Sequence, residues 1–131
     1  MDWGGPSDDY WLYPTGSDAI QGNLRGTAAN QANYSTTVLS VTQNNQYSVD
    51  VNYLADRGAY SGSASYYGTY DQGGNLWEWN EVVIERAIDD YVRGLRGGSW
   101  DNAEATLRST FRTGEVPEAE TPFVGFQVAG P

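Results

Sequence analysis

The sequence predicts one irregular α+β domain in which short strands and long ordered loops outweigh helix. Glycine, serine, threonine, asparagine and tyrosine are abundant and strong helix formers are scarce, a composition that favours strands and turns. Aromatic residues make up 14% of the chain and must supply much of the core, because aliphatic runs are short. Only one segment carries a helical pattern. A chain of 131 residues fits a single domain, so residues 1–131 are expected to form one.

Short strands are expected at intervals along the chain. Residues 47–53 alternate apolar and polar side chains with the period of a half-buried strand. The other strand candidates are residues 36–41, 77–81, 95–100, 107–112 and 123–129. An aromatic segment at residues 10–16 ends in a turn before the first of these strands. A second turn is expected at residues 44–46, and loops are expected at residues 57–65 and 115–122.

The helical candidate is residues 82–92. Ile84, Ala87, Ile88 and Tyr91 would share one face of a helix there. The same residues also suit a strand followed by an excursion, and the pattern alone does not choose between the two.

Composition excludes several kinds of chemistry. The chain has no Cys, no His and no Lys, and its seven cations are all arginines. The chain therefore lacks the side chains needed for thiol chemistry, imidazole base catalysis, lysine Schiff bases and zinc sites built on nitrogen or sulfur. Carboxylates, amides and backbone carbonyls remain, and these hard oxygen ligands suit Ca²⁺ or Mg²⁺.

The net charge of −10 argues against a nucleic-acid partner, because phosphates would be repelled. The charge serves solubility or adapts the protein to a cation-rich exterior. No apolar run approaches the roughly 20 residues that span a membrane. The first five residues lack the basic start and apolar core of a signal peptide.

Residues 67–79 are the most informative segment. They combine glycines, tyrosines and two tryptophans with the carboxylates of Asp71 and Glu78. Glycines allow tight turns, tryptophans favour burial, and a carboxylate between two tryptophans needs a cation or several donors. We therefore expect a tight buried loop organised around a positive charge. A metal ion is the first candidate.

Three segments in order resemble one known family. They are residues 67–79, the Arg-Gly-Gly-Ser-Trp sequence at 96–100, and the pair Arg108 and Arg112 followed by residues 125–129. The pattern is similar to the formylglycine-generating enzyme family, also called sulfatase-modifying factor domains. It covers about the C-terminal half of the chain, and the segments at residues 13–19 and 59–75 resemble a secreted bacterial subgroup. The resemblance implies a C-type-lectin-like fold with short antiparallel strands, long ordered loops and bound calcium.

The resemblance also implies the calcium ligands. Asp71 and Glu78 would supply side-chain oxygens, and Gly74 and Leu76 would supply backbone carbonyls. Alternating side-chain and carbonyl oxygens over eight residues can encircle a calcium ion. The alternative is a packed aromatic turn in which Glu78 pairs with an arginine.

A second calcium site is a weaker expectation from the same resemblance. It would use Asn33 and, with imperfect register, Asp50. Asn33 also begins an Asn-Tyr-Ser glycosylation sequon. A buried calcium ligand could not carry a glycan, so these two interpretations exclude each other, and the triplet can also arise by chance.

The arginines Arg96, Arg108 and Arg112 resemble structural arginines that pair with carboxylates or carbonyls in a loop-rich core. A role in binding a substrate anion is the alternative. Trp100 is expected in the core rather than as a platform for a ligand.

The chain departs from the enzymes of this family at one place. Those enzymes use two cysteines, just after the Gly-Gly-Ser sequence, to bind copper and activate oxygen. Here Asn102 stands near the first position and Thr106 or Leu107 near the second. No copper site and no catalytic residues are expected, and the chain is predicted not to be an enzyme. Related iron-dependent sulfoxide synthases use three histidines, and this chain has no histidine.

The family domain normally begins well upstream of the part matched here, so the resemblance predicts that this chain is a reduced domain or a C-terminal half. We expect it to assemble with itself or with a completing partner through its aromatic N-terminal segment, residues 1–30, and in particular residues 3–13. The predicted function is a calcium-stabilised, secreted bacterial domain for extracellular binding or assembly, with a carbohydrate or protein ligand. The alternatives are a structural subunit of a bacterial surface filament or layer, and a diverged formylglycine-generating oxidase.

Overall fold

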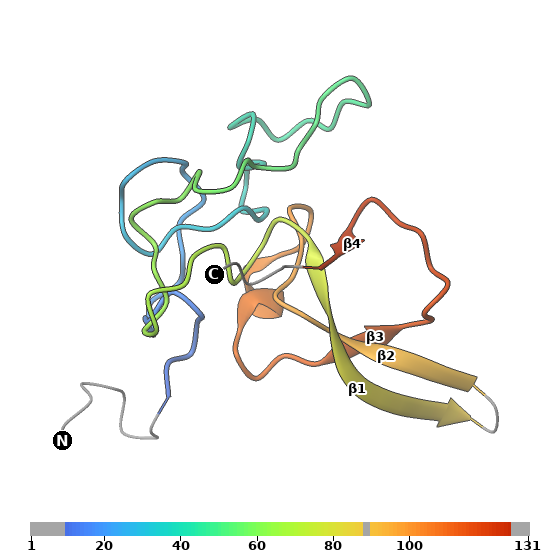
Figure 1. The fold of residues 1–131 in the computed structure, drawn as a ribbon. Helices are drawn as coiled ribbons and strands as arrows, with labels where there is room; N and C mark the ends of the chain where they lie inside the picture. Colours follow the sequence, from blue (N-terminus) through green and yellow to red (C-terminus); the bar gives the residue numbers. More distant parts are fainter. Residues whose placement is uncertain (1–9, 88–89, 127–131) are drawn as a thin grey trace, which may run out of the picture.

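The computed structural model describes residues 10–87 and 90–126, and it contains one small sheet and much irregular chain (Figure 1). The elements in order are β1 (Trp77–Ala87), β2 (Asp90–Arg96), the 3-10 helix η1 (Glu104–Leu107), β3 (Thr113–Glu115) and β4 (Val124–Gly125). The sheet order is β3-β2-β1-β4. β2 is antiparallel to β1 and β3, while β4 is parallel to β1. The β1–β2 hairpin extends away from the irregular N-terminal half (Figure 1).

Of the two alternatives at 82–92, the helix is wrong, because β1 and β2 pair there as antiparallel strands. Val83 pairs with Arg93 and Ile84 pairs with Val92 across the β1–β2 ladder. The run of β-branched residues at 82–84 favours a strand over a helix. Ile88 lies outside the described residues. Within the described chain, helix is limited to the four residues of η1, so the helical part of the α+β prediction is not confirmed.

The other predicted strands of the C-terminal half differ in their bounds from those in the structure. The expected strand at 77–81 is confirmed and extends to Ala87. The expected strand at 95–100 stops at Arg96, because Gly97 and Gly98 turn the chain with φ of 91° and 73°. Residues 107–112 form the end of η1 and a turn, and the strand follows at 113–115. In the expected strand at 123–129, only Val124–Gly125 is paired within the described part.

The N-terminal half has isolated bridges in place of strands. Residues 36–41 contribute single bridges and residues 47–53 contribute none, so both strand predictions are wrong. Side chains satisfy the backbone there instead. Asn23, which is buried, donates from Nδ2 to the carbonyls of Tyr34 and Val38, at 3.2 and 2.8 Å. Polar side chains that cap nearby carbonyls compete with sheet formation, which explains the lost strands.

Two aromatic-rich clusters form the core. The first unites Tyr13, Ala32, Tyr34 and Leu107. The second unites Leu39, Tyr53 and Trp100, with Phe123 packed against it. Trp100 is stacked on Tyr53 with ring centroids 4.7 Å apart, so its predicted place in the core is confirmed. Among the described residues, no helix is long and apolar enough to cross a bilayer.

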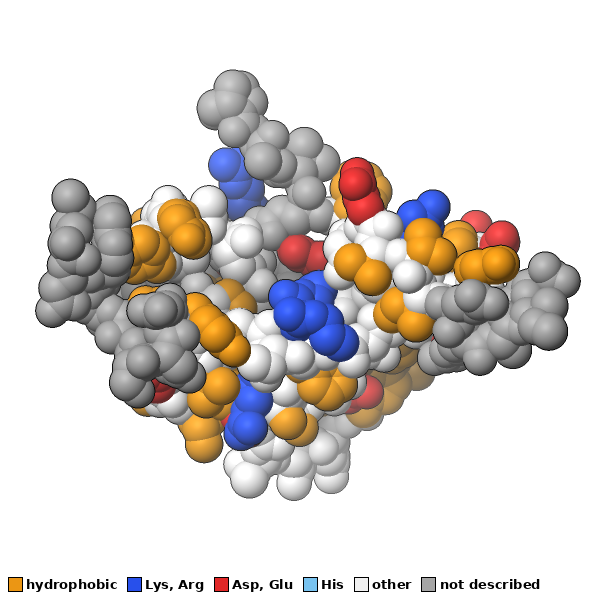
Figure 2. Space-filling view, turned by 90° about the horizontal axis from the view of Figure 1, so that it is seen from below, with side chains coloured by type: hydrophobic (Ala, Val, Ile, Leu, Met, Phe, Trp, Pro, Cys, Tyr) orange, Lys and Arg blue, Asp and Glu red, His pale blue; other side chains and the backbone are white. Residues whose placement is uncertain are grey.

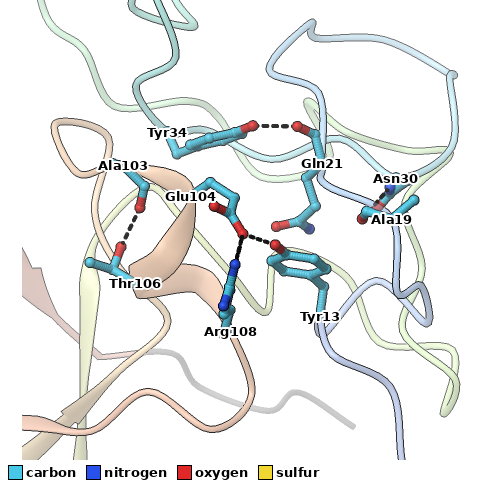
Figure 3. A network of polar contacts seen from close by, with 9 residues as sticks. All are labelled: Tyr13, Ala19, Gln21, Asn30, Tyr34, Ala103, Glu104, Thr106 and Arg108. Atoms are coloured by element: carbon cyan, nitrogen blue, oxygen red, sulfur yellow. Dashed lines mark hydrogen bonds and ion pairs between the residues drawn. The ribbon is translucent and has the colours of Figure 1, made fainter. Parts of the chain in front are cut away.

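Tyr13 lies in the N-terminal segment that is expected to mediate assembly, and it is buried. Its side chain is only 1% exposed. Its hydroxyl donates a hydrogen bond to Glu104, which Arg108 also contacts (Figure 3). Tyr13 is therefore part of the folded body and is not available for assembly. The residues before Tyr10 lie outside the described part.

Candidate metal centre

The glycine- and tryptophan-rich loop is held by residues with left-handed backbone. Asp71, Gly74 and Asn75 have φ of 58°, 77° and 70°. Gly74 bridges Asn33 so closely that a Cβ there would collide with the Asn33 carbonyl. Only glycine fits at this point, and the close approach fixes the loop against the segment around Asn33.

Asn75 joins this loop to three other segments. Its N–H donates to the Asn33 carbonyl at 2.7 Å, and its own carbonyl accepts from the Trp100 N–H at 3.0 Å. Its Oδ1 accepts from the Ala55 N–H and from Asn33 Nδ2, both at 2.8 Å. Asn75 was not among the predicted site residues. Its place after two glycines was the available signal, because asparagine tolerates left-handed backbone.

The carboxylates of Asp71 and Glu78 come together beside this loop. Burial, and to a smaller extent the nearby negative charge of Asp71, together raise the pKa of Glu78 to about 7. Asp71 accepts one hydrogen bond at Oδ2, from the Gly58 N–H at 3.1 Å. Two carboxylates that repel one another in a half-buried position are an arrangement that a cation would stabilise.

Among the described residues, no arginine forms an ion pair with either carboxylate. Arg96 stands opposite Glu78 in the β1–β2 ladder, but it donates to the Phe111 carbonyl at 3.0 Å. Within the described part of the chain, the ion pair present is the one between Arg108 and Glu104. This observation disfavours the alternative in which Glu78 pairs with an arginine.

The two predicted carbonyl ligands are also free. No described residue donates a hydrogen bond to the carbonyl oxygens of Gly74 or Leu76. Among the described residues, no group of three or more acidic, His or Cys side chains could hold a metal ion, so a site here would rest on the two carboxylates and these carbonyls. Hard oxygens of this kind fit Ca²⁺. The residues present therefore fit the ion that the family resemblance implies.

Asn33 and Asp50, expected at a second site, are not brought together by any hydrogen bond or ion pair. Asp50 is exposed, and its N–H contacts Ser48 Oγ at 3.3 Å. Asn33 is 1% exposed and donates from Nδ2 to the Tyr53 carbonyl at 2.9 Å. Its Oδ1 is buried without a hydrogen-bond partner among the described residues. That oxygen is of the type that coordinates calcium. The burial of Asn33 is incompatible with a glycan in the folded protein.

The three arginines pair as the sequence predicted. Arg108 contacts the Glu104 carboxylate from Nη2 and Nε, each at 3.1 Å. Arg96 and Arg112 donate to backbone carbonyls. On the face shown in Figure 2, one basic patch lies near the centre beside an acidic side chain, and other basic side chains lie apart from it.

The two positions of the family's cysteines have structural contacts here. Asn102 Oδ1 accepts hydrogen bonds from the Ser99 N–H and hydroxyl, at 3.0 and 2.7 Å. Leu107 is 1% exposed and lies in the first core cluster. Thr106 donates from Oγ1 to the Ala103 carbonyl at 2.9 Å. These side chains complete a turn and the core.

The fold and the loop define a class of protein, in which a small sheet supports a long irregular segment around a glycine- and tryptophan-rich loop. The family described as "Sulfatase-modifying factor enzyme 1-like domain" matches residues 5–130, so the chain belongs to that family. The family implies a C-type-lectin-like fold, and the described chain agrees with it in having short strands and little helix. Membership confirms the resemblance noted in the sequence. The secreted bacterial subgroup remains a prediction.

Several curated proteins are similar to part of the chain. The proteins named inactive C-alpha-formylglycine-generating enzyme 2 of Bos taurus and Mus musculus are each 40% identical over 68 residues, which is 48% of this chain and 22% of the relative. Hercynine oxygenase of Mycolicibacterium smegmatis is 32% identical over 91 residues, which is 55% of this chain and 21% of the relative. The chain thus spans about a fifth of the length of the curated relatives it matches.

These relatives correct one prediction. The chain was expected not to be an enzyme, and the hercynine oxygenases among its relatives contradict that expectation, although their similarity is partial and distant. The relatives that are named as inactive fit a protein that is not an enzyme. The missing cysteines exclude one thiol-dependent mechanism within this chain and do not decide the question for the family.

Proposed function

We propose that this chain is a calcium-stabilised domain that acts outside the cell in binding or assembly. The observation that carries the proposal is the pair of half-buried carboxylates Asp71 and Glu78, in which burial and the Asp71 charge disfavour the ionised form of Glu78 and a cation would favour it. Gly74 and Leu76 would add their carbonyl oxygens to the same ion. Bound calcium would supply the positive charge that this loop lacks and would fix its geometry.

An extracellular setting suits such an ion. Calcium modules that work outside cells bind with dissociation constants on the order of 10⁻⁴–10⁻³ M, which the surrounding calcium can saturate. The net charge of −10 is compatible with a cation-rich exterior. Secretion by a bacterium is part of the same proposal.

Isothermal titration calorimetry with calcium tests the metal site directly. The chain should bind calcium saturably, and Glu78→Gln and Asp71→Asn should each abolish that heat. The exposed Glu118 offers a matched control, since Glu118→Gln also removes one carboxylate and should leave the binding unchanged. Absence of calcium binding, or equal loss in the Glu118 variant, would overturn the site.

A structural subunit of a surface filament or layer is the second candidate, and the open edge of β1 favours it. β4 pairs only with Trp77 and Glu78, so the rest of β1 has no partner on that side among the described residues. Val82, Val83 and Tyr91 of the hairpin are 58%, 52% and 51% exposed. Unpaired strand edges with exposed apolar side chains invite pairing with other chains.

Light scattering on the wild type and three variants tests assembly. If the hairpin mediates it, Val82→Lys should reduce the mass in solution, while Val49→Lys, at an exposed valine elsewhere, should not. If the N-terminal aromatic residues mediate it, deleting residues 1–9 should reduce the mass and leave the buried Tyr13 in place. A monomer in every case would rule out self-assembly.

A further inference from the structure

Two oppositely charged residues face each other in the sheet without pairing. Glu78 and Arg96 are opposed in the β1–β2 ladder, where opposite charges normally attract. Arg96 instead directs Nη1 to the carbonyl oxygen of Phe111, at 3.0 Å. Its positive charge is left without a carboxylate among the described residues.

A second arginine converges on the same carbonyl. Arg112 Nη1 donates to the Phe111 oxygen at 2.9 Å and to the Ser109 oxygen at 2.7 Å. Because both Nη1 atoms contact one oxygen, they lie within about 6 Å of each other. Two guanidinium charges at this separation repel one another.

The chain does not lack carboxylates for such arginines. It has 17 acidic residues against 7 basic ones, and Arg108 takes Glu104 as its partner nearby. Arg96 and Arg112 are held by neutral carbonyls instead. In an acidic protein, two adjacent arginines without a described carboxylate form a local excess of positive charge.

Both guanidinium groups keep donors available. Each has five N–H donors, and the described contacts use only Nη1 of each. The backbone turn at Ser109 and Phe111 fixes Arg112, which is exposed, so its remaining donors are held in place before any ligand arrives. Rigid guanidinium forks match the spacing of two oxygens on one anion.

We propose that Arg96 and Arg112 form a binding site for an oxyanion, that is, a sulfate, phosphate or carboxylate group. The anion would bridge the two guanidinium groups and neutralise their repulsion. This site goes beyond the proposed calcium function and uses neither Asp71 nor Glu78, so each can fail without the other.

Calorimetric titration with sodium sulfate, phosphate and acetate tests the site, in calcium-free buffer with chloride as background anion and constant ionic strength. The chain should bind at least one of these anions saturably. A preference for sulfate or phosphate indicates a tetrahedral group, and a preference for acetate indicates a carboxylate. No saturable binding of any of the three would overturn the proposal.

Arg112→Gln keeps an N–H donor for the carbonyls but removes the charge. It should weaken anion binding by roughly tenfold or more, since a charge-assisted hydrogen bond is lost. Arg57→Gln is the matched control, because Arg57 is exposed and distant in sequence, and its removal should leave affinity unchanged. Equal weakening in both variants would show a general charge effect and reject the site.

Chemical modification gives a second test that needs no variant. Phenylglyoxal modifies accessible arginines, and mass spectrometry of peptides locates the modified residues. The bound anion should protect Arg112 selectively and leave Arg57 reactive. Protection of all arginines alike, or of none, would contradict the assignment.

Discussion

Asn33 and Asn75 exchange two hydrogen bonds, one between backbone atoms and one between side chains. The Asn75 N–H donates to the Asn33 carbonyl at 2.7 Å, and Asn33 Nδ2 donates to Asn75 Oδ1 at 2.8 Å. This contact joins segments 42 residues apart. It places the loop that carries Asp71 and Glu78 against the core. The position of these candidate calcium ligands therefore depends on two asparagines that are not themselves ligands of the proposed first site.

Asn75→Ala should destabilise the chain by about 3 kcal/mol, because it removes side-chain hydrogen bonds and places a residue with a Cβ at a positive φ. Asn75→Gly should cost about 1 kcal/mol less, since glycine relieves the backbone term alone. Urea unfolding measures both values. Asn45→Ala, at an exposed asparagine, is the control and should have little effect. Equal losses for the Ala and Gly variants would show that backbone conformation contributes nothing.

Removing calcium should lower the melting temperature. At a calcium concentration about 100 times the dissociation constant, binding adds roughly 2.7 kcal/mol of stability. For a chain of this size, its loss corresponds to a fall of roughly 10 °C. Melting followed by circular dichroism, with and without chelator, measures the change. Glu78→Gln should melt like the chelated protein and should not respond to chelator, and an identical melt of the wild type in both buffers would disprove the site.

The metal-free chain should lose stability as pH rises. Burial and the Asp71 charge raise the pKa of Glu78 from 4.5 to about 7, so between those values the folded chain holds a proton that the unfolded chain has released. Stability is therefore fully present below about 4.5 and declines as pH rises towards 7. Urea midpoints in chelator across this range measure the slope at Glu78. Glu78→Gln should flatten the slope, and saturating calcium should reverse it. A slope unchanged by the substitution would assign it to other groups.

The sequon at Asn33 should stay unmodified in the folded chain. The Asn33 side chain is 1% exposed and donates to the Tyr53 carbonyl at 2.9 Å. Secretion from a glycosylating host, followed by peptide mass spectrometry, should give unmodified Asn33 in the soluble, folded fraction. A glycan on folded protein would contradict the burial of this side chain.

The candidate metal site could be proposed from the sequence because its expected ligands are close together in the chain. Asp71, Gly74, Leu76 and Glu78 lie within eight positions, and glycine and asparagine mark the left-handed turns between them. The secondary structure was harder to predict. Residues 82–92 suit a helix or a strand by period, and the pairing of Ile84 with Val92 decides for the strand.

The sequence alone determined the family, the absence of thiols and imidazoles in this chain, and the carboxylates of the glycine- and tryptophan-rich loop. These are properties of residue identity and short spacing. Only the tertiary structure decided that Glu78 and Arg96 face each other without pairing, that Arg96 and Arg112 share the Phe111 carbonyl, and that Tyr13 is buried. The physical reason is that such contacts join distant segments. Whether a side chain contacts a carbonyl or a carboxylate depends on which of the two the folded chain brings within reach.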